Sequence, residues 1–498
     1  MSELLLGIDI GTSSSKGVLA RPDGKVLAIS VRAHELSLPR PGWAEHDAEN
    51  VWWTDFQALC AELLPKANSS LAAICVSGIG PSLLPINEKG ESLRPAILYG
   101  IDTRAAREIE ELTERYGAGK ILEIGGSLLT SQSIGPKLLW LRHNEPEIWK
   151  QMRHFLMASS FIVYRLTGEY VLDHPSASQC NPLYNLKENR WIESWAEEIA
   201  PGLRLPRLLW PAEVAGKVTP AAAKETGIPA GTLVATGTLD AYSEALSVGV
   251  RDPGDRMLMY GSTMFLIEIF HEAKAHPRLW CTTGIFPDTQ ASSAGMATSG
   301  ALTGWLRHIA GDPPYETLVD EASRIKPGSD GLVVLPYFAG ERSPLFDPKA
   351  RGVICGLTLR HGRGHLYRAV LEATAYGLRD ILEVMYEAEE GGKKLIAVGG
   401  GTKGGLWMQI VSDVTGMPQE LPRETIGASY GDALLAAIAT GLVKPSETWN
   451  ATAALIEPNA KAHEVYTDFY QVFRELFPAI HAQLHNLADL QERDLAIE

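Results

Sequence analysis

Hydrophobic and polar positions along the chain predict strands and helices that alternate from one end to the other. Short apolar runs bounded by glycine, at residues 4–8, 74–80 and 256–270, are typical of buried strands. The last run contains a Gly-Ser-Thr turn at 261–263, so it predicts two strands joined there. Apolar residues at helical spacing extend furthest at residues 365–388, which predicts the longest helix. This mixture predicts an α/β fold.

Other segments continue the alternation. Residues 94–101 predict a strand and residues 104–116 a charged surface helix. Residues 232–240 predict a strand that ends in a glycine turn before a helix, and residues 395–405 predict the same succession. A chain of 498 residues exceeds one typical core, so we expect two large domains. A polar turn near residues 247–255 places the boundary between residues 1–247 and 248–498.

The composition narrows the classes of partner. The formal net charge of −15 argues against wrapping nucleic acid or anionic membrane, although a local pocket for one nucleotide remains possible. No apolar run reaches the roughly 18 residues that span a bilayer, and the N-terminus lacks the pattern of a signal peptide. The five cysteines are scattered without CxxC spacing. They predict reduced thiols in a cytoplasmic protein, with neither disulfides nor a cysteine zinc site.

The first candidate for chemistry is the polar turn after the N-terminal strand. Glycine at position 11 allows close backbone approach, Thr12 and Ser13 can donate to phosphate oxygens, and Lys16 adds a positive charge. Asp9 can hold magnesium through water, because Mg²⁺ prefers oxygen ligands. The alternative is a polar hairpin turn in which Asp9 caps its own backbone.

Two glycine-containing turns in the second half offer similar chemistry. The turn Gly261-Ser262-Thr263 echoes the first one, which is faint evidence for an internal duplication. Residues 399–405, GGGTKGG, follow a strand and precede a helix, so bare backbone and a helix N-terminus suit a nucleotide. The spacing is not that of a Walker A loop. A plain turn remains the alternative for each segment.

Asp240 ends a predicted strand directly before a predicted helix. In that position an aspartate is either a helix N-cap or a general base directed into a binding site.

Together these segments resemble the FGGY carbohydrate kinases, over the whole chain and in the expected order. The resemblance rests on DIGTSSSK (9–16), TGTLDAYSEALSVGV (236–250), YGST (260–263), YFAGERSP (337–344) and VGGGTKGGLWMQIVSDVTG (398–416). GVICGL (352–357), followed after seven residues by HLYRAVLE (365–372), fits the C-terminal signature of that family in full. The resemblance implies two ribonuclease-H-like domains with the actin-like ATPase fold flanking a deep cleft. It also implies a cytoplasmic kinase that uses ATP and Mg²⁺ and commonly forms a homodimer.

The resemblance also implies roles for single residues. Asp240 matches the catalytic base, and Asp9 matches the acid associated with magnesium. The positions that match the phosphate- and nucleotide-binding residues of the family are Gly11, Thr12, Ser13, Lys16, Gly261, Ser262, Thr263, Gly300, Gly304, Gly400, Gly401, Thr402 and Gly405. Some relatives have an adenine-contacting asparagine where this chain has Gly405. His361 and His365 are interpreted as polar groups at a helix start rather than metal ligands.

Within the family the chain most resembles the xylulose kinases, which implies phosphorylation of D-xylulose to D-xylulose 5-phosphate. The substrate loop departs from that pattern, with Gly78-Ile79-Gly80 in place of Met-His-Gly and Tyr99-Gly100-Ile101-Asp102 in place of Trp-Asn-Asp. Another FGGY substrate, such as ribulose, erythritol, glycerol or gluconate, therefore stays open, as does an ATPase switch of the actin or chaperone class. The candidate sugar-binding residues are Gly78, Ile79, Gly80, Tyr99, Asp102, Arg104 and Asp240. For Asp102 and Arg104 a surface turn or an indirect contact is the alternative.

Overall fold

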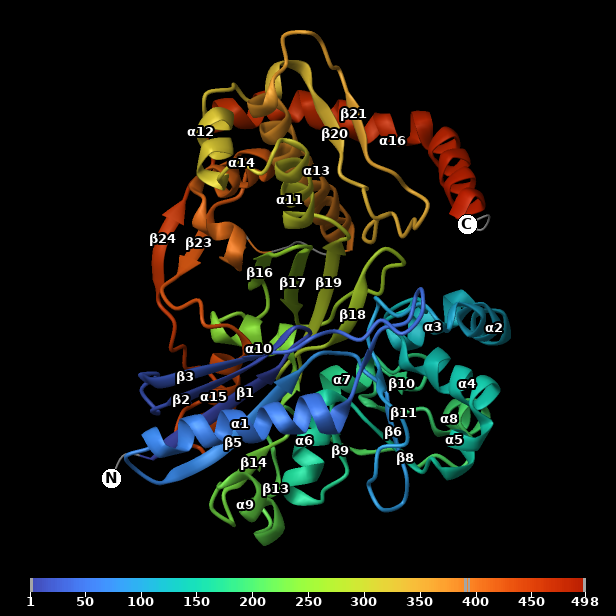
Figure 1. The fold of residues 1–498 in the computed structure, drawn as a ribbon, viewed down its shortest axis with the longest axis vertical. Coiled ribbons are helices and arrows are strands. Elements are labelled where there is room, and N and C mark those ends of the chain that lie inside the picture. Colours follow the sequence, from blue (N-terminus) through green and yellow to red (C-terminus); the bar gives the residue numbers. More distant parts are fainter. Residues whose placement is uncertain (1–2, 389–391, 393–394, 496–498) are drawn as a thin grey trace. The chain divides into compact units, whose positions relative to one another are not determined.

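The computed structural model describes residues 3–388, 392 and 395–495 (Figure 1). It divides into two compact units. Unit 1 comprises Met1–Asp252, Ile269–Ala291 and Ile426–Asn450, and unit 2 comprises Pro253–Glu268, Ser292–Thr425 and Ala451–Glu498. Each unit is therefore assembled from segments that are distant in the sequence.

The chain alternates between strands and helices, as the hydrophobic pattern predicts. The strands are β1 (Leu4–Ile10), β2 (Ser14–Ala20), β3 (Val26–Ala33), β4 (Glu45–His46), β5 (Leu71–Gly78), β6 (Leu84–Ile86), β7 (Ala96–Ile97), β8 (His154–Leu156), β9 (Val171–Asp173), β10 (Tyr184–Asn185), β11 (Arg190–Trp191), β12 (Arg207–Leu209), β13 (Val214–Lys217), β14 (Leu233–Ala235), β15 (Thr238–Leu239), β16 (Arg256–Tyr260), β17 (Met264–Phe270), β18 (Trp280–Thr283), β19 (Gln290–Met296), β20 (Val333–Leu335), β21 (Val353–Cys355), β22 (Leu395–Val398), β23 (Gln419–Pro422) and β24 (Thr452–Ile456).

The helices range from single turns to a very long C-terminal helix. They are α1 (Thr54–Leu63), α2 (Ala106–Tyr116), α3 (Ala118–Gly125), α4 (Ile134–Asn144), α5 (Pro146–Gln151), α6 (Ala158–Thr167), α7 (His174–Ser178), α8 (Glu193–Ile199), α9 (Pro220–Thr226), α10 (Asp240–Ser247), α11 (Gly300–Ile309), α12 (Tyr315–Ser323), α13 (Arg363–Ala388), α14 (Gly405–Thr415), α15 (Ala428–Ala439) and α16 (Ala460–Leu495), with the short η1 (Ala48–Trp53), η2 (Leu64–Lys66), η3 (Ser329–Gly331) and η4 (Gly400–Lys403).

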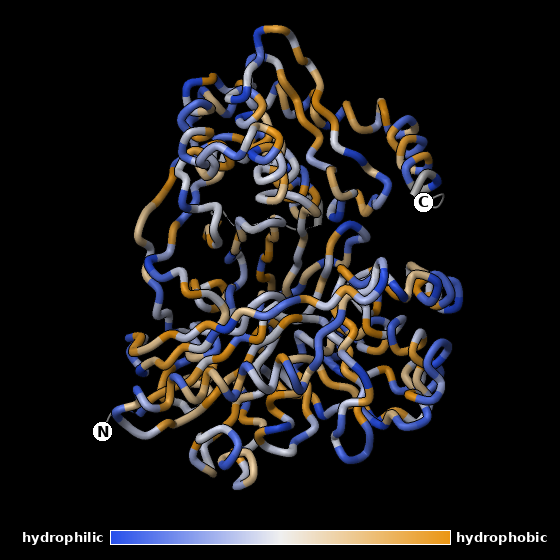
Figure 2. The backbone as a smooth tube through the Cα atoms, in the orientation of Figure 1, coloured by the Kyte–Doolittle hydropathy of each residue, from blue (hydrophilic) through white to orange (hydrophobic). Residues whose placement is uncertain are grey.

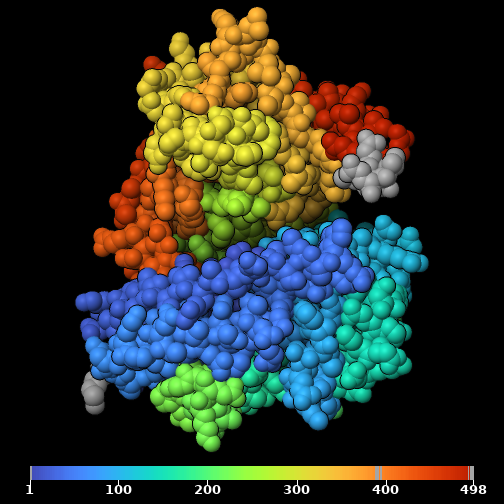
Figure 3. All heavy atoms as spheres, in the orientation of Figure 1, coloured from blue at the N-terminus to red at the C-terminus, as the bar shows by residue number. Residues whose placement is uncertain are grey.

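A mixed sheet in the order β13-β14-β5-β1-β2-β3 forms the centre of unit 1, and β15 also pairs with β5. Helices cover both of its faces. A Cβ atom at Gly7 of β1 would collide with the backbone of Ser429 and Ala433 in α15. A Cβ atom at Gly17, which pairs with Ile8, would lie 2.6 Å from Leu63 of α1. Because neighbouring residues of a strand point to opposite faces, α15 and α1 cover opposite faces, and Figures 1 and 3 show α1 across one of them.

The sheet of unit 2 repeats this arrangement and has one further strand, β18, at its edge. Its strands follow the order β18-β19-β17-β16-β22-β23-β24. As β1 runs antiparallel to β2 and parallel to β5, so β16 runs antiparallel to β17 and parallel to β22. β5 is parallel to β14 as β22 is parallel to β23, and β14 is antiparallel to β13 as β23 is antiparallel to β24. The two strand-turn-strand segments noted in the sequence therefore occupy equivalent places, which agrees with an internal duplication.

Apolar side chains from the sheet and its helices form the core of each unit. In unit 1 they include Leu6 of β1, Phe56 of α1, Val76 of β5 and Phe161 of α6, all fully buried. In unit 2 a smaller cluster joins β20 to α13. Figure 2 shows the sheet strands largely in the colours of hydrophobic residues and the charged helix α2 largely in blue.

The predictions for residues 94–101 and 365–388 were wrong in part. The predicted strand at 94–101 is paired as a strand only at Ala96–Ile97, because the chain then turns and Gly100 N donates to Gln132 Oε1 at 3.1 Å. The helix over 365–388 is real but not the longest, since α13 has 26 residues and α16 has 36. Charged residues interrupt the apolar positions of α16 throughout, so it has no prominent apolar run.

The structure also bears on the expectations from composition. All five cysteines are free, and four of them are buried. In the part of the chain that the structure describes, no helix is both long enough and apolar enough to cross a lipid bilayer.

Candidate functional site

Asp9, at the end of β1, is the centre of a group of carboxylates in unit 1. In the sheet it lies opposite Lys16 of β2 and beside Ser77 of β5. The hydroxyl of Ser77 is 3.3 Å from Asp9 Oδ1 and 2.7 Å from Asp432 Oδ2. Asp432 also accepts a hydrogen bond of 2.6 Å from Ser243. Burial holds the pKa of Asp432 well above its ordinary value.

Helix α10 contributes Asp240 and Glu244 to the same group. The two residues are four positions apart, so they lie on the same face of the helix. Asp240 is the first residue of α10, and its Oδ1 accepts a hydrogen bond of 2.7 Å from Ala241 N. Burial, together with the neighbouring Glu244 charge, raises the pKa of Asp240 to about 7. Asp240 is thus a carboxylate whose proton affinity suits a general base near neutral pH.

Negative charge exceeds positive charge within this group. The pKa of Asp9 is raised to about 8, first by burial and then by the charges of Asp240 and Glu244. Lys16 opposes this shift, but its ammonium is a single positive charge and also donates to Ile426 O at 2.6 Å. Three carboxylates with only oxygen donors and one nearby ammonium fit a hard divalent cation such as Mg²⁺, which would supply the missing positive charge.

The first candidate phosphate-binding turn directly follows Asp9 and Ile10. Gly11 N donates to Ser14 O at 3.1 Å, which closes the turn and leaves Thr12 half-buried and Ser13 exposed. His34 packs under the turn, with its Nε2 3.1 Å from Gly11 O and its Nδ1 2.8 Å from Asp55 Oδ2. Burial lowers the pKa of His34, but its contacts with Asp55 and the turn carbonyls outweigh burial and raise the pKa overall. Both ring nitrogens face acceptors, so a protonated His34 stabilises the turn.

The second candidate turn, at 261–263 in unit 2, packs against the start of α11. Gly261 N donates to Thr263 O at 3.1 Å, and Gly300 N donates to Gly261 O at 3.0 Å. Ala301 N donates to Ser262 O at 3.0 Å. A Cβ atom at Gly300 would lie 2.5 Å from Gly261 O, so only glycine allows this close approach. The structure thus brings Gly300 together with the turn, and the predicted contact of both with the nucleotide stays a prediction.

Gly304 lies one helical turn further along α11. A Cβ atom there would meet nothing closer than Tyr315 Oη at 3.6 Å. Packing therefore does not require glycine at this position, and its predicted contact with the nucleotide stays a prediction.

The third candidate segment, residues 399–405, leaves the sheet edge next to the second turn. β16 and β22 are parallel, with Met259 opposite Val398, so the segments that follow them emerge at the same edge. Gly399 has φ +93°, and a Cβ atom there would lie 2.6 Å from Tyr260 O. The glycine therefore lets this segment pass directly beside the strand that ends at residue 260.

Within that segment the backbone is partly free of neighbours. A Cβ atom at Gly400 or Gly405 would meet nothing within 4 Å, whereas one at Gly401 would lie 2.7 Å from the Trp407 ring. Thr402 Oγ1 donates to Gly399 O at 2.8 Å and closes the turn. Open backbone at Gly400 and Gly405, with the N-terminus of α14 beginning at Gly405, suits a flat ligand with a negatively charged end.

The predicted substrate loop at 78–80 lies beside the residue that precedes Asp240. Leu239 pairs with Gly78 in parallel register, and a Cβ atom at Gly80 would collide with the Leu239 side chain. The Ile79 side chain packs in the core of unit 1. The structure therefore brings Gly78–Gly80 and Asp240 into one region of unit 1.

Asp102 and Arg104, predicted to contact or support the sugar, form a buried ion pair. Arg104 Nη2 is 2.7 Å from Asp102 Oδ2, and both side chains are 0% exposed. Asp102 Oδ2 also accepts from Ala44 N at 2.7 Å, and the guanidinium of Arg104 stacks 3.9 Å from the Trp43 ring centre. Because each side chain is occupied by the other, this geometry favours the indirect role, in which the pair holds the segment that begins at Tyr99.

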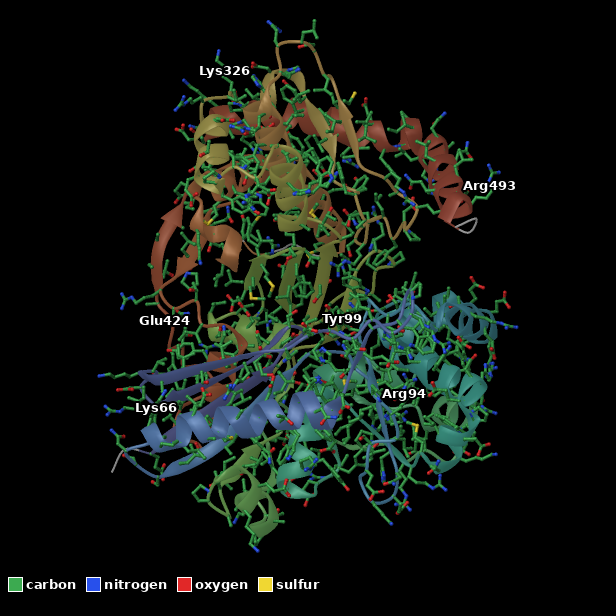
Figure 4. The ribbon with its side chains drawn as sticks, viewed as in Figure 1. Lys66, Arg94, Tyr99, Lys326, Glu424 and Arg493 are labelled. Carbon is green, nitrogen blue, oxygen red and sulfur yellow. The ribbon has the colours of Figure 1, made fainter. Side chains whose placement is uncertain are left out.

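Lys137 on α4 is a further buried cation in this region. It donates to Leu98 O at 2.5 Å and to Tyr99 O at 3.3 Å. Burial lowers its pKa to about 7. A cavity of about 120 Å³ lined by Lys137, Asp102 and Ser131 adjoins it. Figure 4 labels Tyr99, whose carbonyl oxygen accepts from Lys137.

Sequence reasoning missed several residues of the carboxylate group. Glu244 could have been found from the sequence, because it lies four residues after Asp240 on a predicted helix. Ser77, Asp432 and His34 had no such signal, since they come from distant segments that only the assembled sheet brings beside Asp9 and its turn.

Two family models match successive parts of the chain. Residues 4–247 match the model for the N-terminal domain of the FGGY family of carbohydrate kinases, and residues 258–440 match the model for its C-terminal domain. A protein named xylulose kinase from Lactococcus lactis subsp. lactis is 27% identical over 98% of this chain and 99% of its own length.

Solved structures of similar proteins cover nearly the whole chain. The crystal structure of a xylulose kinase from Rhodospirillum rubrum is 32% identical, covers 97% of this chain and 100% of its own, and superposes with a TM-score of 0.90. That of a gluconate kinase from Lactobacillus acidophilus is 25% identical, covers 98% and 100%, and has a TM-score of 0.92. These likenesses confirm the α/β architecture with two actin-like ATPase domains. Membership of a sugar kinase family implies ATP as phosphate donor and a sugar hydroxyl as acceptor, and on these matches the chain belongs to the FGGY family of carbohydrate kinases.

Proposed function

We propose that this chain transfers the γ-phosphate of ATP to a hydroxyl of a ketopentose, with D-xylulose as the substrate and D-xylulose 5-phosphate as the product. The observation that carries the proposal is the placement of Asp240. Its carboxylate is held by Ala241 N, has a pKa of about 7 and lies in the same region of unit 1 as the loop at 78–80. The names of the relatives support xylulose over other sugars.

Asp240 acts as the general base in this proposal. It accepts the proton of the sugar hydroxyl while the hydroxyl oxygen attacks the γ-phosphorus. A phosphorus–oxygen bond forms to the sugar, and the bond between the γ-phosphorus and the bridging oxygen of ATP breaks. ADP leaves with the electron pair of that bond. Since little covalent chemistry falls to the protein, alignment and charge neutralisation account for most of the rate.

Asp9 would hold Mg²⁺ through water, and the ion would supply positive charge to the phosphates when bound. Lys16 and the amides and hydroxyls of Gly11, Thr12 and Ser13 would position phosphate oxygens on unit 1. On unit 2 the turn at 261–263 and the start of α11 would bind phosphates, and the segment at 400–405 would bind the adenosine. The hydrogen bonds that close these turns support these roles.

We extend the proposal to a cytoplasmic location. Five free thiols, four of them buried, support a reducing compartment.

A coupled assay of ADP release tests the proposal. D-xylulose, D-ribulose, aldopentoses, erythritol, glycerol and gluconate are compared at equal concentration, with a reaction without sugar as the baseline. We expect the highest kcat/KM with D-xylulose and little ADP without sugar. A higher kcat/KM with gluconate or a polyol would show that this compound, and not D-xylulose, is the substrate. ADP release that does not depend on any sugar would favour the ATPase switch.

A further inference from the structure

Three potential metal ligands meet in unit 2, on residues that the proposed kinase reaction does not use. His481 and His485 lie on α16, and Asp347 lies between β20 and β21. One ligand atom of each residue lies within 4.8 Å of the others. We propose that Asp347, His481 and His485 form a binding site for a Zn²⁺ ion that holds the C-terminal part of α16 against residues 341–351.

The spacing of the two histidines fits such a site. Residues four apart lie on the same face of a helix, and the two rings are 4.0 Å apart between centres. His485 Nε2 is 2.7 Å and His481 Nε2 is 3.7 Å from the same oxygen, Asp347 Oδ2. Ligand atoms around tetrahedral Zn²⁺ with bonds near 2.0 Å are separated by roughly 3.3 Å. The observed separations bracket this value, so small side-chain rotations bring the three ligands to the ion.

The backbone around Asp347 holds its carboxylate in place. Its N–H and C=O form two hydrogen bonds of 2.9 Å with the backbone of Glu341. Its Oδ1 accepts from Lys349 N at 2.9 Å, which directs the other oxygen, Oδ2, toward the histidines. Hydrogen bonds of this kind, made by the part of a ligand that does not face the metal, orient ligands in known metal sites.

Exposure and charge also favour an ion here. The Asp347 side chain is only 14% exposed, whereas His485 is 32% and His481 is 46% exposed, so the histidines leave a path from solvent. Two imidazoles and one carboxylate are a ligand set that Zn²⁺ accepts with water in the fourth position. This set lacks thiolate, so it suits Zn²⁺ or a similar divalent transition ion rather than Cu⁺.

Neighbouring contacts show what the ion would strengthen. Lys349 Nζ is 2.5 Å from Asp489 Oδ1, and Arg351 Nε donates to Gln491 Oε1 at 2.8 Å. Both pairs join the segment after Asp347 to the same part of α16. These pairs lie at the surface, where single ion pairs contribute little, whereas a metal bridge is a much stronger link.

A second group of two histidines and an aspartate in unit 2 provides a matched control. His361 and His365 face Asp330, but the Nδ1 of each histidine accepts a backbone N–H, from Thr358 at 2.9 Å and from Gly362 at 3.1 Å. Their remaining nitrogens lie 3.2 Å from Asp330 O and 3.3 Å from Asp330 Oδ2. This group has the same residue types, but its ring nitrogens already have partners at a helix start.

Zinc titration of the full-length, untagged protein tests the site. The protein is stripped with a chelator and titrated with Zn²⁺ against a chromogenic competitor, in millimolar Mg²⁺ so that the carboxylate group of unit 1 is occupied. We expect one bound Zn²⁺, binding at least about tenfold weaker in His485→Ala and Asp347→Asn, and unchanged binding in the double variant His361→Ala/His365→Ala. With Co²⁺ as the probe, we expect the visible absorption of a tetrahedral site, absent from His485→Ala.

The outcome does not depend on the kinase assay. His485 is partly exposed, so its alanine variant should fold, and a circular dichroism spectrum and a zinc-free melting temperature equal to those of the wild type confirm that it does. Zinc should also raise the melting temperature of the wild type more than that of His485→Ala. Failure of the wild type to bind Zn²⁺, or equal binding by the wild type and His485→Ala, would overturn the proposal.

Discussion

The turns at 11–14 and 261–263 have the same backbone setting and opposite chemistry. Each follows the central strand of its sheet, and in each the glycine N–H donates to a carbonyl within the turn at 3.1 Å. Two residues before the glycine, unit 1 pairs Asp9 with Lys16 across the strands. In the same place unit 2 pairs Met259 with Phe265. One topology thus carries an ionic pair in unit 1 and an apolar pair in unit 2.

The next strand of each sheet shows the same contrast. Beside Asp9 lies Ser77 of β5, and beside Met259 lies Val398 of β22. After them come Gly78-Ile79-Gly80 in unit 1 and Gly399-Gly400-Gly401 in unit 2. The comparison indicates a division of labour: unit 1 gathers carboxylates suited to proton transfer and a cation, and unit 2 offers bare backbone suited to a nucleotide. The predictions below test this division.

The largest effect is expected from Asp240→Asn. The amide keeps the shape of the side chain but cannot accept the sugar proton, so kcat should fall about 10²–10⁴-fold. The dissociation constant for ADP should stay within about twofold, because the nucleotide residues of unit 2 are intact. Steady-state kinetics and calorimetry measure the two quantities.

Asp23→Asn is the matched control for that substitution. Asp23 is in the turn between β2 and β3, where its Oδ1 accepts from Lys25 N in an exposed position. This variant should keep full activity. Full turnover by Asp240→Asn would remove Asp240 from its proposed role.

Next in size is the loss of stability from Asp102→Asn. The substitution leaves the fully buried Arg104 charge with Glu45 as its remaining carboxylate partner, at 2.8 Å, so the loss should lie below the about 3–5 kcal/mol typical of a buried charge that loses its only partner. Denaturant unfolding gives the free energy, and sugar kinetics should show a raised KM, because the segment beginning at Tyr99 loses its support.

Glu268→Gln is the counterpart in unit 2. Glu268 and Arg256 form an equally buried pair at 2.6 Å on β17 and β16. A comparable loss of stability is expected, but without the rise in the KM for sugar. If both variants changed that KM equally, the ion pair of unit 1 would have no special relation to the sugar.

A smaller effect is expected from Gly300→Ala. The added Cβ would press on Gly261 O at 2.5 Å and displace the turn at 261–263, so ADP should bind about tenfold more weakly. In Gly304→Ala the Cβ has room, so the turn stays in place. Weaker ADP binding by this variant would therefore report direct contact of residue 304 with the nucleotide. Unchanged ADP affinity in Gly300→Ala would show that this turn does not hold the nucleotide.

The smallest effect concerns pH and Mg²⁺. Burial raises the pKa of Asp9 to about 8 and that of Asp240 to about 7, so below these values the carboxylates take up protons and lose their function. At limiting Mg²⁺, kcat/KM should therefore fall as the pH drops through this range. Because the cation competes with protons for the same oxygens, higher Mg²⁺ should move the fall to lower pH, by up to about one unit for a tenfold rise in concentration. A pH profile that is independent of Mg²⁺ would contradict this account.

Much of the fold could be predicted from local patterns. Buried strands such as β1, β16 and β17 are apolar except for one charged residue each, so their places are visible in the sequence. The polar residues Ser14–Lys16 were predicted as part of a turn, but they begin β2, because pairing with β1 and β3 on either side outweighs their polarity. The helix α16 was not predicted. Only a narrow stripe of its residues is buried, so its sequence shows no prominent apolar pattern.

The candidate site was predictable where chemistry and spacing coincide in one segment. Asp9 and Asp240 each precede a recognisable turn or helix, and the glycines at 261 and 399–401 each follow a strand. Asp432 and Ser77 could not be found this way, because α15 and β5 meet Asp9 only in the folded unit. The buried pairing of Asp102 with Arg104 was likewise invisible, since two charged residues before a helix usually lie at the surface.

Hydrogen–deuterium exchange with one ligand at a time tests the division of labour most directly. ADP alone should slow amide exchange at residues 261–263, 299–304 and 399–405 of unit 2, whereas D-xylulose alone should slow it at residues 78–80 and 239–241 of unit 1. If ADP alone protected the segments of unit 1 and left those of unit 2 unchanged, the assignment of the nucleotide to the glycine-rich turns would be wrong.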